Sequence, residues 1–177
     1  MSAKQGNGSN KLNIRKITVY ALMVSLCLIV GYLESLLSGV FFTFAPGIKL
    51  GLSNALVLTL VCNGDKKGAF LVNIARILLS ACLFGSAISF AFALSGGLLS
   101  LCTVCVLCRL KSVSAIGVSI VGGVVHNMTQ CIVCVAVTGV GMFYYLPLLI
   151  AGGAVCGALC GIFSQLILKK VKTNGII

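Results

Sequence analysis

Long apolar runs separated by short polar segments make up most of the chain. The runs cover residues 17–38, 50–62, 68–85, 87–110, 113–138 and 142–168. Most of them reach or approach the ~20 residues that a helix needs to cross hydrocarbon. The run 50–62 is shorter, so we expect the segment before it to dip into the membrane with it. The pattern predicts an all-α bundle of six transmembrane helices, with a re-entrant or lid-like loop between the first and second helices.

Composition favours a membrane protein over a soluble one. Of the 177 residues, 59% are hydrophobic and 8% are charged, and the mean hydropathy is +1.17. A soluble all-α domain of this composition would lack the charged surface that keeps it in solution. We divide the chain into a disordered, polar N-terminal tail (1–14), one transmembrane domain (15–170) and a C-terminal tail (171–177).

Basic residues occur in alternate connections between the runs. Of the 13 Lys and Arg residues, 11 lie before the first run, after the second, at or just after the end of the fourth, or after the sixth. This is the positive-inside pattern, and it places both termini in the cytoplasm. The net charge of +11 therefore reflects topology in a lipid bilayer. We expect no nucleic-acid partner.

The stretch Phe44–Asn54 (FAPGIKLGLSN) interrupts the apolar pattern. Pro46 lacks a backbone N–H and the glycines that follow it are conformationally free, so a regular helix should break here. Irregular backbone at membrane depth survives where it lines protein or a wet cavity. Lys49 places a positive charge at the break. We interpret the stretch as the lip of a binding cavity, with Lys49 and Asn54 as candidate ligand contacts.

Arg76 is a charged residue inside the third run. A guanidinium near the bilayer centre costs about 2.5 kcal/mol or more, so it normally faces a partner or a water-filled cavity. Two interpretations stay open: contact with a bound ligand, or an ion pair with Glu34, one of the 2 acidic residues of the chain. The two are compatible, because Glu34 can orient Arg76. Asn73 lies three residues before Arg76 and shares its helical face.

The fifth run carries three polar side chains close together, at His126, Asn127 and Gln130. Such residues often hydrogen-bond between helices, and they can equally line a pocket. Positive charges at Lys49 and Arg76 outnumber the single negative charge at Glu34, which favours an anionic ligand group, either a carboxylate or a phosphate. The predicted substrate-binding residues are Glu34, Lys49, Asn54, Asn73, Arg76, His126, Asn127 and Gln130.

Other features of the runs indicate packing. Nearly all of the 10 cysteines lie in apolar runs, where Cys acts as a small hydrophobe, and we predict neither a metal nor a cofactor. Ala21 and Ser25 form a small-xxx-small pair that permits close helix approach, and glycines at 153, 157 and 161 form a similar stripe in the last run. Pro147 predicts a kink in that run.

Four motifs give the chain a family resemblance: PGIKLGLSN, RILLSACLFGS, SGGLLSL and HNMTQ, in this order. Over about residues 15–170 the chain resembles the Gx transporter family, also labelled heptaprenyl diphosphate synthase component I. That family is similar to the substrate-binding S-components of energy-coupling-factor (ECF) transporters. The resemblance implies a six-helix subunit of the bacterial plasma membrane. It also implies a transmembrane coupling subunit that contacts Ala21 and Ser25, and two ATPases as further partners.

Two functions follow from the resemblance. The first is an S-component-like subunit that captures a small anionic metabolite from the outer face. The alternative is a non-catalytic membrane accessory subunit of a polyprenyl diphosphate synthase or quinone-biosynthesis system. We do not expect an enzyme, because prenyl diphosphate synthases hold Mg²⁺ with clustered aspartates and this chain has a single aspartate, Asp65. The chain also has no phosphate-binding G-x-x-x-x-G-K-[ST] loop, so an ATPase is expected on partner chains.

Overall fold

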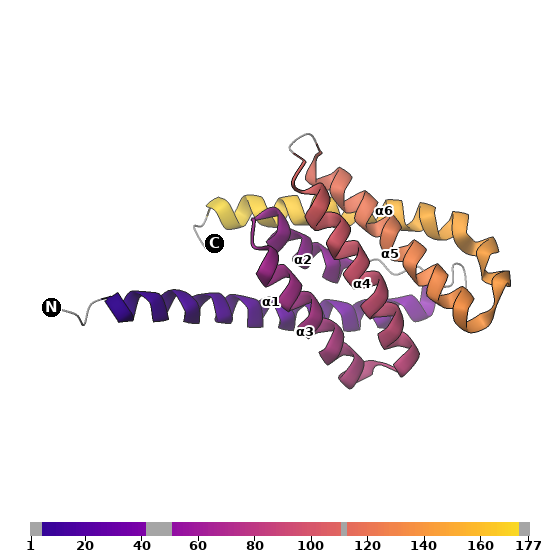
Figure 1. The fold of residues 1–177 in the computed structure, drawn as a ribbon, viewed down its shortest axis with the longest axis horizontal. Coiled ribbons are helices and arrows are strands. Elements are labelled where there is room, and N and C mark those ends of the chain that lie inside the picture. The colour runs from indigo at the N-terminus through magenta and orange to yellow at the C-terminus, as the bar shows by residue number, and fades with distance from the viewer. Residues whose placement is uncertain (1–4, 42–50, 111–112, 174–177) are drawn as a thin grey trace.

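The computed structural model describes residues 5–41, 51–110 and 113–173, and every element in these ranges is a helix (Figure 1). The elements in chain order are α1 (Gln5–Phe41), α2 (Leu52–Cys62), α3 (Lys66–Phe84), α4 (Ala87–Leu107), α5 (Ala115–Thr138), the 3-10 helix η1 (Val140–Tyr145) and α6 (Leu146–Thr173). The predicted all-α class is confirmed. Lys49 and most of the predicted loop between the first two helices lie outside the described residues.

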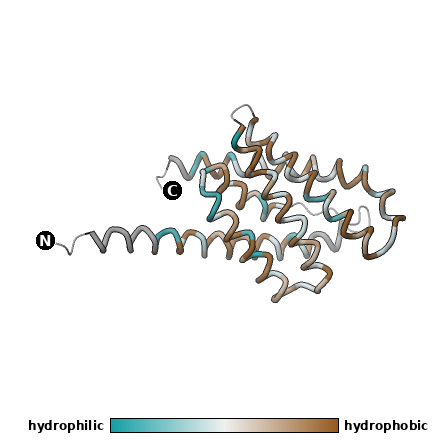
Figure 2. The backbone as a smooth tube through the Cα atoms, in the orientation of Figure 1, coloured by the Kyte–Doolittle hydropathy of each residue, from teal (hydrophilic) through white to brown (hydrophobic). Residues whose placement is uncertain are grey.

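Five of these helices, α1 and α3 to α6, are long and apolar enough to cross a membrane. Their outer faces carry many exposed large apolar side chains, such as Leu22 (60% exposed), Leu83 (60%) and Val155 (62%). Such faces are unfavourable in water and suit a lipid surround. Figure 2 shows the same apolar character along the helices. The chain is therefore an all-α, multi-pass membrane protein, and α2, with 11 residues, is shorter than the other α-helices described.

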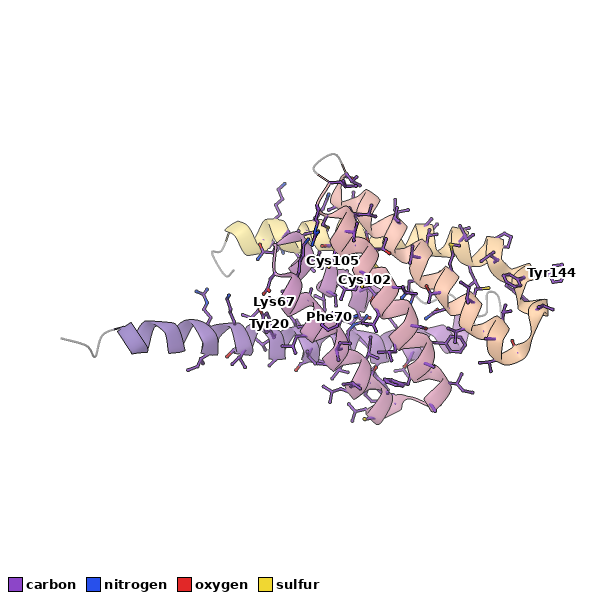
Figure 3. All side chains as sticks on the ribbon, in the orientation of Figure 1. Tyr20, Lys67, Phe70, Cys102, Cys105 and Tyr144 are labelled. Carbon is purple, nitrogen blue, oxygen red and sulfur yellow. The ribbon has the colours of Figure 1, made fainter. Side chains whose placement is uncertain are left out.

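Polar connections gather at one end of the bundle. Tyr20 in α1 donates a hydrogen bond to Asp65 in the α2–α3 connection. Lys66 Nζ donates to the carbonyl oxygen of Cys105, near the end of α4, at 2.9 Å. The end of α6 lies toward this side as well, and Figure 3 shows Tyr144 at the opposite end. Clusters of basic residues that are far apart in the sequence thus share one end of the fold, which we call the basic end.

Three helices begin at a residue whose side chain satisfies a free backbone N–H of the first turn. Asp65 accepts from the N–H three residues later at 2.9 Å. Ser86 and Ser114 do the same for α4 and α5, at 3.2 Å and 3.1 Å. Capping of this kind fixes where a helix starts, because the first four N–H groups of a helix have no partner inside it.

Helices α5 and α6 pack with their backbones in contact. A Cβ atom added at Gly123 would lie 2.4 Å from the Gly153 carbonyl oxygen, and one at Gly157 would lie 2.6 Å from the Ser119 carbonyl oxygen. A Cβ at Gly161 would lie 2.8 Å from the Cα of Ile116. The tight packing predicted for the glycine stripe is confirmed, and its partner is α5.

Two boundaries differ from the sequence-based prediction. Helix α1 already includes Gln5, within the segment that we expected to be disordered. The predicted last run divides into η1 and α6, and Pro147 is the second residue of α6. Proline is tolerated in a first turn, where no intrahelical N–H bond is lost. The predicted kink at Pro147 is wrong, since this proline helps to start the helix.

Candidate functional site

A cavity of about 180 Å³ opens among α1 to α5. It lies in the half of the bundle that is far from the basic end, because its lining comes from late α1 and α3 and early α2 and α4. Its polar lining includes Glu34, Asn54, Arg76, Ser80, His126 and Gln130, and its apolar lining includes Leu28, Tyr32, Ile77, Phe84 and Phe90. We call it the main cavity.

Arg76 enters the main cavity from α3 and is half-buried. Its Nε and Nη2 donate to Asn73 Oδ1 at 3.0 Å and 2.8 Å. Its Nη1 donates to Ser53 Oγ at 3.2 Å, and Nη2 also donates to Asn54 Oδ1. These oxygen atoms belong to neutral side chains. They orient the guanidinium without neutralising its charge, and the acidic side chain that lines the same cavity is Glu34.

Glu34 enters the same cavity from α1 and is 7% exposed. Its Oε1 accepts a hydrogen bond from the backbone N–H of Leu52, the first residue of α2. The residue before it, Gly51, has a φ of 70° and gives α2 no side-chain cap of its own. A carboxylate at a helix N-terminus is stabilised by the unpaired N–H groups and the helix dipole. Glu34 therefore caps α2 from another helix.

His126 and Gln130 face the cavity from α5, one turn apart. Gln130 Nε2 lies 3.0 Å from His126 Nε2. The two side chains are therefore hydrogen-bonded to each other along one face of α5. The ring lies against α4, because a Cβ at Gly96 would lie 3.0 Å from His126 Nδ1.

Asn73 and Asn127 line a second, smaller cavity of about 70 Å³. Asn127 is buried and its Nδ2 donates to the Leu149 carbonyl oxygen at 2.9 Å, which joins α5 to α6. Asn73 Nδ2 donates to the Gly97 carbonyl oxygen at 3.2 Å. Asn54 and His126 line both cavities. The second cavity thus adjoins the main one on the α6 side.

The structure brings Glu34, Asn54, Arg76, His126 and Gln130 to the main cavity and Asn73 and Asn127 to its neighbour. Ala21 and Ser25 are exposed on α1, earlier on the helix than Glu34, and neither lines a cavity. Ser25 Oγ donates to the Ala21 carbonyl oxygen at 2.9 Å. Lys49 falls outside the described residues.

Sequence analysis missed Ser53 and Ser89 as lining residues. Ser53 precedes Asn54 and shares its partner, Arg76, so the position next to a predicted ligand contact was an available signal. Nothing in the sequence around Ser89 indicates the cavity, because Ser is also the usual start of a helix. Within the described ranges, no group of three or more His, Cys, Asp or Glu side chains is arranged to hold a metal ion.

The fold and the cavity define a multi-pass helical membrane protein with a polar, charged site inside its bundle. A family model described as heptaprenyl diphosphate synthase component I matches residues 23–167, so the chain belongs to this family. Searches of curated proteins and of solved structures gave no match. Component I is a name that implies partner subunits.

Proposed function

We propose that the protein is the substrate-binding subunit of an energy-coupled transporter of ECF type, and that it captures a small anionic solute. The observation that carries the proposal is Arg76, a guanidinium that faces an intramembrane cavity while its own hydrogen bonds go to the neutral side chains of Ser53, Asn54 and Asn73. A charge held in this way at membrane depth normally marks a substrate pathway.

The position of the main cavity supports capture from outside the cell. It lies in the half of the bundle far from the basic end. Under the positive-inside rule the basic end faces the cytoplasm, so the cavity half faces outward. A solute entering from that side meets Arg76, which binds an anionic group with charge-assisted hydrogen bonds. Gln130 and Ser80 offer hydrogen bonds to neutral parts of the solute.

We also propose that the chain is not itself a catalyst. The single aspartate, Asp65, caps α3 at the basic end, away from the cavity. The energy for transport would come from ATPases on partner chains, linked through a transmembrane coupling subunit. The exposed small pair of Ala21 and Ser25 is our candidate contact for that subunit.

The alternative function is a membrane accessory subunit of a heptaprenyl diphosphate synthase, which the description of the family favours. Two features of the main cavity favour the transporter over this alternative. The cavity volume is about 180 Å³, below the ~300–1,000 Å³ of pockets that enclose a drug-sized ligand. The cavity also lacks the carboxylate cluster that would hold a magnesium diphosphate, as judged over the described residues.

The test is to purify the protein in lipid nanodiscs and to identify retained solutes by mass spectrometry. We expect a small acidic solute on the wild type and at least a tenfold lower amount on Arg76→Gln. The matched control is Arg109→Gln, which removes the same charge at the basic end. Equal retention by the wild type and Arg76→Gln contradicts the proposal.

Co-purification from mild detergent separates the two functions. Recovery of ATPases and a membrane coupling subunit supports the transporter. Recovery of a soluble prenyl diphosphate synthase instead supports the accessory subunit and counts against the transporter.

A further inference from the structure

We infer that the second cavity is a subsite for the far end of the solute, and that this end is a neutral group with both a hydrogen-bond donor and an acceptor, as in a carboxamide. The inference rests on the proposed function and narrows its substrate class. The solute is then a small anion whose other end is an uncharged, amide-like group. Ser119 in α5 becomes a binding residue alongside Asn54 and Asn127.

Two polar side chains of α5 present oxygen atoms to the second cavity. Ser119 and Asn127 both line it and are 6% and 5% exposed. Asn127 Nδ2 donates to the Leu149 carbonyl oxygen, which leaves Oδ1 as a separate acceptor. Within the described residues, neither Asn127 Oδ1 nor Ser119 Oγ has a hydrogen-bond partner, and neither atom is completely enclosed by protein. Buried polar atoms normally have a partner, so an occupant of the cavity has to supply one.

Asn54 in α2 supplies the complementary donor. Its Oδ1 accepts from Arg76 Nη2, and a guanidinium can only donate, so this contact fixes the orientation of the amide. The Nδ2 group is therefore left as a donor, and nothing in the described part of the chain accepts from it. The second cavity thus combines a donor at Asn54, an acceptor at Asn127 and the hydroxyl of Ser119, which can take either role.

This combination selects a neutral group. A carboxylate has acceptors only, so it would leave Asn127 Oδ1 buried without a donor. An ammonium group has donors only, so it would leave Asn54 Nδ2 without an acceptor. Leaving a buried polar group unsatisfied is unfavourable. A carboxamide carries a carbonyl oxygen and N–H groups together, and it satisfies both asparagines.

The size of the second cavity indicates an amide rather than a hydroxyl. Its volume of about 70 Å³ corresponds to about two waters at ~30 Å³ each. A hydroxyl group would replace one water, whereas the oxygen and nitrogen of a carboxamide can replace both and keep their hydrogen bonds.

The position of the second cavity connects it to the anion site. Gly51, Asn54 and His126 line both cavities, so the two adjoin. Asn54 orients Arg76 with its Oδ1 and lines the second cavity as well. A solute that binds Arg76 with its anionic group can therefore place its other end in the second cavity.

The experiment measures binding of matched probes to the full chain in nanodiscs by isothermal titration calorimetry. The carboxamides are succinamate and glutaramate, which differ in length by one methylene. Their apolar isosteres are 4-methylpentanoate and 5-methylhexanoate, which have the same charge and nearly the same shape. The dicarboxylates of the same lengths are succinate and glutarate. We expect the wild type to bind at least one carboxamide about tenfold more tightly than its isostere and its dicarboxylate, because only the carboxamide pairs with both asparagines.

Ser119→Ala removes one hydroxyl and breaks no hydrogen bond among the described residues, so its unfolding temperature should equal that of the wild type. We expect it to reduce the preference for the carboxamide over its isostere by about fivefold. The matched control is Ser95→Ala. Ser95 lies on α4, lines neither cavity and donates to the Ala91 carbonyl oxygen of its own helix. The preference of the control should equal that of the wild type.

Three results overturn the inference: no binding of either carboxamide, no wild-type preference for a carboxamide at either length, or an unchanged preference in Ser119→Ala. Equal binding of a carboxamide and its isostere would mean that the second cavity holds water only. The wild-type preference decides the inference even where Ser119→Ala does not accumulate.

Arg76→Gln separates this failure from that of the proposed function. If Arg76→Gln loses both members of each pair, anion capture at Arg76 stands whatever the preference between them. If Arg76→Gln binds the probes as the wild type does, the proposed function fails instead. Where no probe binds, retention of an acidic solute by the wild type and its loss in Arg76→Gln keep anion capture, and only the subsite falls.

Discussion

Asn73, one turn before Arg76 on α3, hydrogen-bonds both to Arg76 and to the backbone of α4. Its Oδ1 accepts from both Nε and Nη2 of Arg76, at 3.0 Å and 2.8 Å. Its Nδ2 donates to the Gly97 carbonyl oxygen at 3.2 Å. A Cβ added at Gly97 would lie 3.6 Å from that same Nδ2, so the glycine brings the α4 backbone close to Asn73. One amide thus orients the half-buried guanidinium of Arg76 and joins two helices.

Replacing Asn73 should therefore weaken both the fold and the site. Asn73→Ala leaves two donors of Arg76 and one backbone carbonyl without this partner. A buried polar group left unsatisfied costs about 1–3 kcal/mol. We expect a lower unfolding temperature in detergent and weaker solute binding. Asn63→Ala, at the α2–α3 connection, is the control and should behave like the wild type.

Substitutions at Arg76 should distinguish charge from geometry. Arg76→Gln should lower solute affinity by roughly ten- to a hundredfold, because a charge-assisted hydrogen bond contributes about 1.5–3 kcal/mol. Arg76→Lys should recover only part of this loss, since lysine cannot make the forked contacts to Asn73 and Ser53. Titration of the retained solute measures both. Full recovery by lysine would mean that the oriented guanidinium is unimportant.

The pair Glu34 and Arg76 can also be tested together. If Arg76 serves only to balance Glu34, then Glu34→Gln combined with Arg76→Gln should restore normal uptake in cells. We expect the double variant to fold and to remain unable to bind the solute. Normal uptake by this variant would remove Arg76 from the binding site.

Gly157 should be intolerant of any side chain. In Gly157→Ala the new Cβ would meet backbone atoms, the Ser119 carbonyl oxygen at 2.6 Å and the Ile120 Cα at 2.8 Å. Overpacking of this kind typically costs about 1–3 kcal/mol, so the unfolding temperature should fall. Gly141→Ala is the matched control, since no atom lies within 4 Å of its Cβ position. Equal stability of the two variants would contradict the described packing of α5 on α6.

Bulk at the exposed small pair of α1 should affect assembly and spare binding. Ala21→Leu or Ser25→Leu would separate backbones that small residues allow to meet. We expect less co-purified partner and unchanged solute retention. Ala136→Leu places the same bulk at an exposed position on α5 and should have no effect. Undiminished co-purification with both α1 variants would show that the pair is not the contact.

The orientation in the membrane can be tested with single cysteines in a background that lacks the native ones. We expect Tyr144→Cys to react with an impermeant thiol reagent on intact cells and Lys67→Cys to react only after lysis, because these positions lie at opposite ends of the fold (Figure 3). Labelling of Lys67→Cys on intact cells would show that the topology is the reverse of the one predicted.

Much of this architecture could be predicted from the sequence. Apolar runs identify the helices, and serine or aspartate at their starts identifies three of the caps. The energetic cost of Arg76 in the membrane was enough to predict that it faces a cavity or a partner.

The sequence could not predict how neighbouring polar residues divide between the cavities. Successive residues on a helix point about 100° apart, so His126 faces the main cavity while Asn127 bonds to α6. The capping of α2 by Glu34 could not be predicted from the sequence either. It joins residues 18 positions apart in the sequence, and only the tertiary arrangement brings them together.

The backbone contact between α5 and α6 has a mechanical consequence. Where side chains separate two helices, rotamer changes let one helix slide along the other. Where the Gly123 and Gly157 backbones touch Gly153 and Ser119, no such layer exists to absorb a displacement. Helices α5 and α6 should therefore move together as one rigid pair. Any widening of the main cavity that admits or releases a solute would then come from movement of the other helices against this rigid pair.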